Sequence, residues 1–222
     1  MVGYDPNWPN YSRNLIASTF GAVSDFPSME LDENIKKMIS RGYLFVHINK
    51  TGGSSVHAAI GFDRFRHYTV SELLSVIDYA DWLKLFTFTI VRNPWDRLVS
   101  LYHWRLQTNQ TSLRKYPITF RDWIDECLRY QNPEYLDKPK MFQPQADWIS
   151  IENKIMVNKI VKFESISETL PGILNDLGLR NKPFPHLKKT IRSPYQGYYT
   201  AEGQELVQRY YWRDIEKFDY SF

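Results

Sequence analysis

Cysteine is nearly absent from this chain: its 222 residues include only Cys127. A single thiol excludes an internal disulfide bond and any metal site built from a cluster of cysteines. A chain that uses no disulfide fits a reducing compartment. We therefore expect a cytoplasmic protein.

Long apolar runs are missing as well. The longest, such as residues 43–48, fall far short of the roughly 20 residues that a helix needs to span a bilayer. The first residues, MVGYDPNWPNYSRN, contain no apolar stretch of the kind that signal peptides carry. The sequence thus predicts no transmembrane segment.

A strong excess of charge of either sign is also missing. Lysine and arginine number 28 against 25 acidic residues, a net charge of +3. This does not predict a nucleic-acid partner, but it fits one local anion site. Hydrophobic residues at 43% exclude a disordered chain, and the length favours a single domain. Aromatic residues reach 16%, which indicates either a ring-rich core or a cleft that stacks on sugar or base rings.

Strands and helices alternate along the chain. We expect an irregular leader over residues 1–42, with a short helix at 32–41 closed by Gly42, followed by one domain over residues 43–222. The apolar runs YLFVHI and FTFTIV read as strands, each followed by a helix. Further expected elements are a strand at 159–164 and helices at 54–60, 69–85, 94–106, 168–177 and 201–218.

This order predicts an α/β fold. Strands that alternate with helices pair in parallel, and the helices cover the sheet. The first two strands and the helix between them make a right-handed βαβ unit by the usual rule. We expect a P-loop-like, mostly parallel sheet flanked by helices.

The loop after the first strand, NKTGGSS at residues 49–55, is the most informative segment. A glycine-rich turn before a helix lets backbone N–H groups converge on an anion, and the helix dipole favours negative charge there. Lys50 adds a mobile positive charge. The hydroxyls come from Thr51, Ser54 and Ser55, and the glycines are Gly52 and Gly53. The plain alternative is a turn that needs glycine only for its backbone geometry. The spacing of a Walker A loop is absent.

The second strand ends in Arg92, where a kinase or ATPase would need a carboxylate near a strand end to hold Mg²⁺. A guanidinium at this position suits a phosphate. Ser100 follows eight residues later, off the apolar face of the next helix, where it could share that phosphate. The alternatives are a surface ion pair between Arg92 and Asp96, and a solvated Ser100. Asn93 and Pro94 are suited to begin that helix.

The two predicted anion sites, at the ends of neighbouring strands, have sequences that resemble the motifs of a known family. FVHINKTGGSS resembles the 5′-phosphosulfate loop of sulfotransferases, and IVRNPWDRLVSLYHW resembles their 3′-phosphate motif. The pair is similar to the branch that contains carbohydrate 2-O- and 6-O-sulfotransferases and bacterial relatives. FQPQADWI at residues 142–149 and the ending YYWRDIEKFDYSF also resemble that branch.

The resemblance implies transfer of a sulfuryl group from 3′-phosphoadenosine 5′-phosphosulfate to an acceptor hydroxyl, on a sugar or another alcohol. Lys50 and residues 51–55 would hold the 5′-phosphosulfate, and Arg92 with Ser100 the 3′-phosphate. Lys50 would also neutralise charge that grows on the leaving phosphate oxygen. No metal is required. The loop 188–199 would close over the nucleotide through Lys189, Arg192 and Ser193, with solvated loop charges as the alternative.

The acceptor hydroxyl needs a base, and histidine is the commonest choice. His67 lies between the two phosphate motifs, where the related enzymes place their base, and it directly precedes a helix. The plain alternative is a surface histidine. Glu72, Asp63 and His57 are the next candidates, in that order, whereas His47 fits a packing role within the first strand.

Two other functions fit parts of the sequence. A P-loop-like nucleotide kinase would require Mg²⁺ and bind a nucleoside triphosphate. A non-catalytic nucleotide- or glycan-binding module would bind the product nucleotide and turn over no acceptor. The sequence names neither the acceptor nor the oligomeric state.

Overall fold

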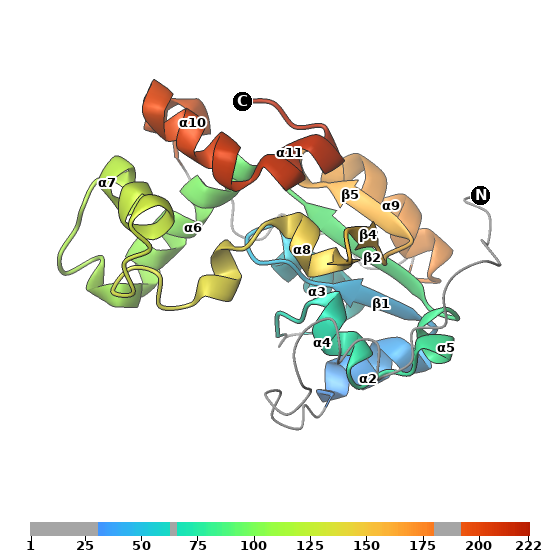
Figure 1. The fold of residues 1–222 in the computed structure, drawn as a ribbon. Coiled ribbons are helices and arrows are strands. Elements are labelled where there is room, and N and C mark those ends of the chain that lie inside the picture. The colour runs from blue at the N-terminus through green and yellow to red at the C-terminus, as the bar shows by residue number, and fades with distance from the viewer. Residues whose placement is uncertain (1–30, 63–65, 180–191) are drawn as a thin grey trace.

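The computed structural model describes residues 31–62, 66–179 and 192–222 (Figure 1). Its centre is a three-stranded sheet in the order β1–β2–β5, in which both pairings are parallel. The strands are β1 (Tyr43–Val46), β2 (Phe86–Val91) and β5 (Lys159–Lys162). The predicted α/β class and parallel sheet are confirmed. An unpredicted antiparallel pair, β3 (Ser150–Ile151) with β4 (Lys154–Ile155), lies beside the sheet.

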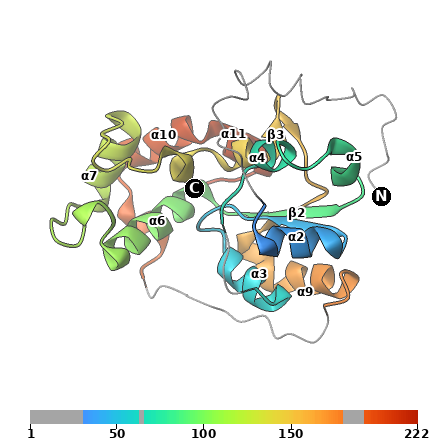
Figure 2. The same cartoon turned by 90° about the horizontal axis from the view of Figure 1, so that it is seen from below.

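Helices cover both faces of the sheet (Figure 2). On one side lie α2 (Glu33–Ser40), α3 (Gly53–Ile60) and α9 (Ile166–Asp176). On the other lie α4 (Val70–Leu74) and α11 (Trp212–Phe218). The expected helix at 32–41 is α2, and its N-cap Asp32 accepts backbone N–H bonds from residues 34 and 35. The rest of the expected leader, residues 1–30, lies outside the described residues.

A second group of helices stands to one side of the sheet, at the left of Figure 1. It contains α6 (Pro94–Thr108), α7 (Phe120–Ile124) and α10 (Ala201–Tyr210). The remaining elements are short. They are α5 (Tyr79–Trp82), η2 (Gln110–Ser112), the π-helical η3 (Asp125–Arg129), η4 (Pro139–Phe142), α8 (Gln145–Ile149), η5 (Phe163–Ser165) and η6 (Tyr195–Tyr198).

Two of the expected helices are wrong in extent. The segment 69–85 forms two short helices, α4 and α5, because the β-branched Val76 and Ile77 and the extended Asp78 interrupt it. The segment 201–218 breaks at Tyr211, whose hydroxyl donates to the Phe142 carbonyl at 2.6 Å. The break allows α10 to join the helical group while α11 packs beside the sheet.

The core has two apolar clusters. One surrounds the sheet and includes Phe45, Phe88 and Trp148, and the other fills the helical group around Trp95 and Trp123. The partly buried Met141 packs against both clusters, so η4 joins the two regions. Within the described ranges, no helix is both long and apolar enough to cross a bilayer.

A buried histidine, His57 of α3, lies in the sheet-side core. Its ring centroid lies 5.4 Å from Phe45 and 5.0 Å from His47. Burial, and then the charge of His67, lower its pKa from 6.5 to about 3. Because the unfolded chain binds this proton near pH 6.5 and the folded chain does not, folding stability is lost as the pH falls from 6.5 toward 3.

We therefore predict that His57→Phe flattens the pH dependence of the free energy of unfolding. Between pH 7.5 and pH 5.5 the wild type should lose about 1 kcal/mol more than the variant, the loss expected from one such group. Urea denaturation at both pH values measures this, with His103→Phe, a half-exposed ring, as the control. If the free energy of unfolding changes equally with pH in wild type and His57→Phe, the lowered pKa of His57 is contradicted.

Candidate active site

The loop between β1 and α3 has a backbone shaped for an anion. Lys50 has φ 65° and Gly52 has φ 88°, both in the left-handed region. The Ser55 N–H donates to the Gly52 carbonyl at 3.0 Å and closes the first turn of α3. The N–H groups of Gly53 and Ser54 belong to this first turn and have no acceptor within the helix. These two amides are the loop's best anion donors.

Both glycines of the loop are also required by packing. A Cβ on Gly52 would lie 2.9 Å from the Phe163 ring, and a Cβ on Gly53 would lie 1.9 Å from Nε2 of His47. The plain geometric reason for glycine therefore holds here, and the anion-binding role of the loop stays a prediction. Since His47 fills the space above Gly53, its predicted packing role agrees with its position just after β1, where it is buried.

The hydroxyls of the loop differ in their roles. Thr51 is fully buried, and its hydroxyl donates to the Ile48 carbonyl at 2.9 Å, so it shapes the loop. Ser55 is buried, and Ser54 is half-buried at the second position of α3. Lys50 extends to the helical group, where its Nζ lies 4.7 Å from the centroid of the Trp104 ring.

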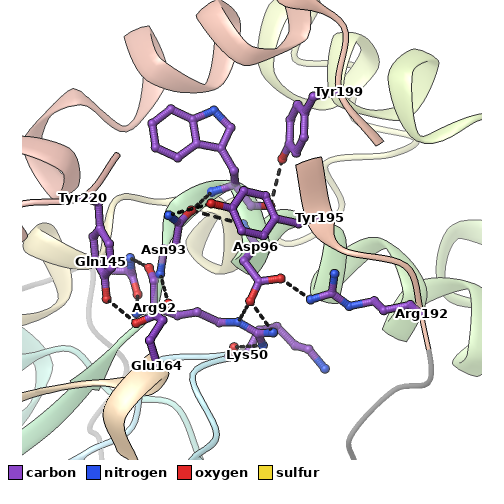
Figure 3. A network of polar contacts seen from close by, with 11 residues as sticks. Lys50, Arg92, Asn93, Asp96, Gln145, Glu164, Arg192, Tyr195, Tyr199 and Tyr220 are labelled. Carbon is purple, nitrogen blue, oxygen red and sulfur yellow. Dashed lines mark hydrogen bonds and ion pairs between the residues drawn. The ribbon is translucent and has the colours of Figure 1, made fainter. Parts of the chain in front are cut away.

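Arg92, directly after β2, connects this loop to α6 (Figure 3). Its Nη1 donates to the Lys50 carbonyl at 3.0 Å, and its Nε donates to the Asp96 carboxylate at 2.7 Å. The guanidinium carbon also lies 4.2 Å from the centroid of the Phe163 ring. The ion pair with Asp96 considered from sequence is present, but it is buried rather than on the surface. Burial lowers the pKa of Arg92, and Asp96 opposes this effect.

Asp96 has a second cationic partner. Arg192 contacts the other carboxylate oxygen, as Figure 3 shows. The structure thus brings the predicted Arg92 and Arg192 to the Asp96 carboxylate, and the charge of a second carboxylate, Glu164, also acts on Arg92. Guanidinium groups suit a further anion because each carries several N–H donors in a planar fork. Ser100 is buried two turns into α6, Ser193 is exposed, and Lys189 lies outside the described residues.

The backbone of Arg92 is held by a buried amide. Gln145 accepts from the Arg92 N–H and donates to the Arg92 carbonyl, both at 2.8 Å. Asp214 in turn accepts from the backbone N–H groups of Gln145 and Ala146, each at 2.8 Å. Burial raises the pKa of Asp214, and these donors oppose the rise. The segment 142–149, whose sequence resembles that of the family, therefore holds the backbone of Arg92 in place.

Asn93 ties the start of α6 to the last residues of the chain. Its Oδ1 accepts from the Trp95 N–H at 3.1 Å, as an N-cap should, and its Nδ2 donates to the Ser221 carbonyl at 2.8 Å. The Asn93 N–H donates to Glu164 at 2.8 Å. The Phe222 ring packs edge-on against Trp95 at 5.5 Å.

Arg97 was not singled out from the sequence, yet its guanidinium makes four hydrogen bonds in the site. It is 2% exposed, and its guanidinium donates to the carbonyl of Asn49 at 3.2 Å and to the side-chain oxygen of Asn49 at 2.6 Å. It also donates to the carbonyls of Met141 and Gln143, both at 3.1 Å. Arg97 lies on the face of α6 that is turned away from solvent. Apart from its place in the RNPWDR motif, nothing in the sequence indicated this position.

His67 lies beside the loop and is half-buried. Its Nδ1 lies 3.0 Å from the His47 carbonyl, and its ring centroid lies 4.3 Å from that of His47. Burial is the main cause that lowers its pKa. A carbonyl only accepts, so Nδ1 carries the proton and Nε2 keeps its lone pair.

Of the other candidate bases, Glu72 and His57 are less well placed. Glu72 accepts from the Thr69 N–H at 2.7 Å in a capping box and is ion-paired with Lys140. His57 is buried in the core, and Asp63 lies outside the described residues, as does His186. Nε2 of His103 contacts the Tyr198 hydroxyl at 3.0 Å.

The comparison with protein families assigns the chain to a class. Residues 42–221 match the model of the sulfotransferase family, which covers well over half of the sequence. The protein therefore belongs to the sulfotransferase family. Neither the curated proteins nor the solved structures contain a match.

The close approach at Gly53 generates a direct prediction. Gly53→Ala forces a Cβ into the His47 ring and should destabilise the protein by about 1–3 kcal/mol, the usual range for overpacking. Gly172→Ala, in open space within α9, is the matched control and should be neutral or stabilising by up to about 1 kcal/mol. Urea denaturation compares the two. Equal stability of both variants would mean that His47 does not fill this space.

Proposed function

We propose that this sulfotransferase uses 3′-phosphoadenosine 5′-phosphosulfate as donor and a hydroxyl group as acceptor. The observation that carries the proposal is the bond between Arg92 and the Lys50 carbonyl. This hydrogen bond connects two parts of the site. One is a loop whose amides suit one anion, and the other is a pair of arginines that suit a second anion. A ligand with two separated anionic groups matches this arrangement, and the family membership supports the same donor.

The chain's residues would divide the donor between them. The amides of Gly53 and Ser54, with Lys50, would hold the 5′-phosphosulfate in a P-loop-like manner. Arg92 and Arg192 would hold the 3′-phosphate, with Ser100, Ser193 and Lys189 as further candidates. The fit rests on the two guanidinium groups that meet at Asp96 and can donate hydrogen bonds to a phosphate. When bound, the donor supplies the sulfuryl group and leaves as adenosine 3′,5′-bisphosphate.

His67 would act on the acceptor. Its uncharged Nε2 would take the proton of the acceptor hydroxyl. The hydroxyl oxygen would bond to the sulfur of the donor, in line with the leaving phosphate oxygen, as the bond from sulfur to that phosphate oxygen breaks. The Lys50 ammonium would move from the Trp104 ring to the negative charge that grows on that oxygen, which lowers the barrier. The acceptor is a sugar or another alcohol, and we place the activity in residues 43–222 and the protein in the cytoplasm.

The first test concerns the 3′-phosphate. Adenosine 3′,5′-bisphosphate should bind at least about 10-fold more tightly than AMP, since a charged hydrogen bond contributes about 1.5–3 kcal/mol. Arg92→Met should remove this difference by weakening the bisphosphate far more than AMP. Calorimetry measures all four affinities. If the wild type binds both nucleotides equally, the site at Arg92 does not read a 3′-phosphate.

The second test concerns the base. His67→Ala should keep its affinity for adenosine 3′,5′-bisphosphate and lose about 10²-fold or more in turnover, the usual contribution of a positioned base. Because the base must be uncharged and its pKa is lowered, the wild-type rate should fall only below pH 6.5, and the variant should lose this acid limb.

The turnover assay follows the labelled sulfuryl group from the donor to a panel of sugars and simple alcohols. His103→Ala, a histidine on the nucleotide side, is the control and should keep the acid limb. A wild-type rate and profile in His67→Ala would rule out His67 as the base. Tight binding of the bisphosphate with no transfer to any acceptor would instead indicate a non-catalytic module.

A further inference from the structure

Lys140 of η4 reaches across the fold to the segment that carries His67. Its Nζ donates to the His67 carbonyl at 2.8 Å and to the two Glu72 carboxylate oxygens at 2.6 and 2.5 Å. The ammonium also lies 5.3 Å from the centroid of the Trp148 ring. These contacts join parts of the chain that are about 70 residues apart, and both charged side chains are largely buried.

We propose that Lys140 is a positioning residue for the base: it fixes the main chain of His67 and places a positive charge beside its imidazole. The proposal rests on the proposed role of His67 in proton removal. Lys140 itself does not take the acceptor proton, because its donors already face the His67 carbonyl and Glu72.

Hydrogen bonds hold both the imidazole ring and the main-chain carbonyl of His67. The ring is held at Nδ1 by the His47 carbonyl and lies 6.2 Å from the centroid of Trp148. Lys140 holds the main-chain carbonyl, and Glu72, which anchors Lys140, is itself fixed by the capping box of α4. Together these contacts restrict the direction in which Nε2 points. A base must stay within hydrogen-bond reach of the proton that it removes, so this restriction affects the rate.

The charges around His67 favour its uncharged form. Lys140, Arg97 and Lys50 all act to lower its pKa, in that order after the effect of burial, while the bond to the His47 carbonyl acts to raise it. The groups that face His67 from the elements packed around it are His47, Lys50, His57, Glu72, Arg97 and Lys140. Glu72 is the one carboxylate in this set, and its charge opposes that of Lys140.

The experiment uses the opposite signs of this ion pair. Removing the positive charge in Lys140→Met should raise the pKa of His67, and removing the negative charge in Glu72→Gln should lower it. Glutamine keeps the capping box. Lys138→Met is the matched control, because it removes an exposed charge from the same segment and should leave the pKa unchanged.

NMR titration of the His67 ring protons, assigned with His67→Asn, measures the pKa without donor or acceptor. If the ion pair were merely structural, both variants would break it and shift the pKa in the same direction. A shift of the same sign in both, or none in either, overturns the proposal. If Lys140→Met does not fold, the sign of the shift in Glu72→Gln decides.

Turnover then links the pKa to the reaction. The acid limb of the rate should move with the NMR pKa, to higher pH in Lys140→Met and to lower pH in Glu72→Gln, and Lys140→Arg should restore it toward wild type. If the NMR pKa shifts but the rate profile does not follow, His67 is not the base and the proposed function needs revision. If the pKa does not shift, the role of Lys140 is wrong whatever the activity shows.

Discussion

The buried guanidinium of Arg97 is the interaction on which the rest of the site depends. One side chain on α6 satisfies both oxygens of Asn49 and the carbonyls of Met141 and Gln143. A buried charge costs several kcal/mol unless it is fully hydrogen-bonded, so these four acceptors must stay in place. The loop at residues 49–55, helix α6 and the η4 segment are thereby held in one arrangement.

The contacts of Arg97 also connect the proposed donor site with the proposed base. Arg92 lies just before α6, the helix that carries Arg97, and its guanidinium donates to the Lys50 carbonyl, so the two proposed anion-binding units share a hydrogen bond. Met141, which accepts from Arg97, is next to Lys140, which holds His67. Phe163 contacts the guanidinium of Arg92 and also occupies the space beside Gly52. Donor binding and base placement therefore depend on the same few buried contacts.

The sequence predicted the local parts of this site well. The strands at 43–48 and 86–91, the glycine-rich turn and the N-cap at Asn93 follow from composition and from turn and capping preferences, which act over a few residues. Arg92 was identified because it follows a strand directly. The helix at 201–218 was predicted too long, since the contact at its break, Tyr211 with Phe142, is between distant residues.

The long-range parts could not be predicted for the same reason. Gln145 bonds the backbone of Arg92 from 53 residues away, and Lys140 bonds His67 from 73 residues away. Neither residue type, a glutamine near a proline or a lysine in a polar segment, signals a partner. Glu72 shows the converse: it was a reasonable candidate base from position alone, and its capping box and its bond to Lys140 give it another role.

The most direct measurement of the central claim is a crystal structure of the protein with adenosine 3′,5′-bisphosphate. The account predicts the 5′-phosphate at the amides of Gly53 and Ser54, and the 3′-phosphate at Arg92 and Arg192, with the bond from Arg92 to the Lys50 carbonyl retained. A nucleotide bound away from this loop, or with its 3′-phosphate directed away from both arginines, would contradict the account.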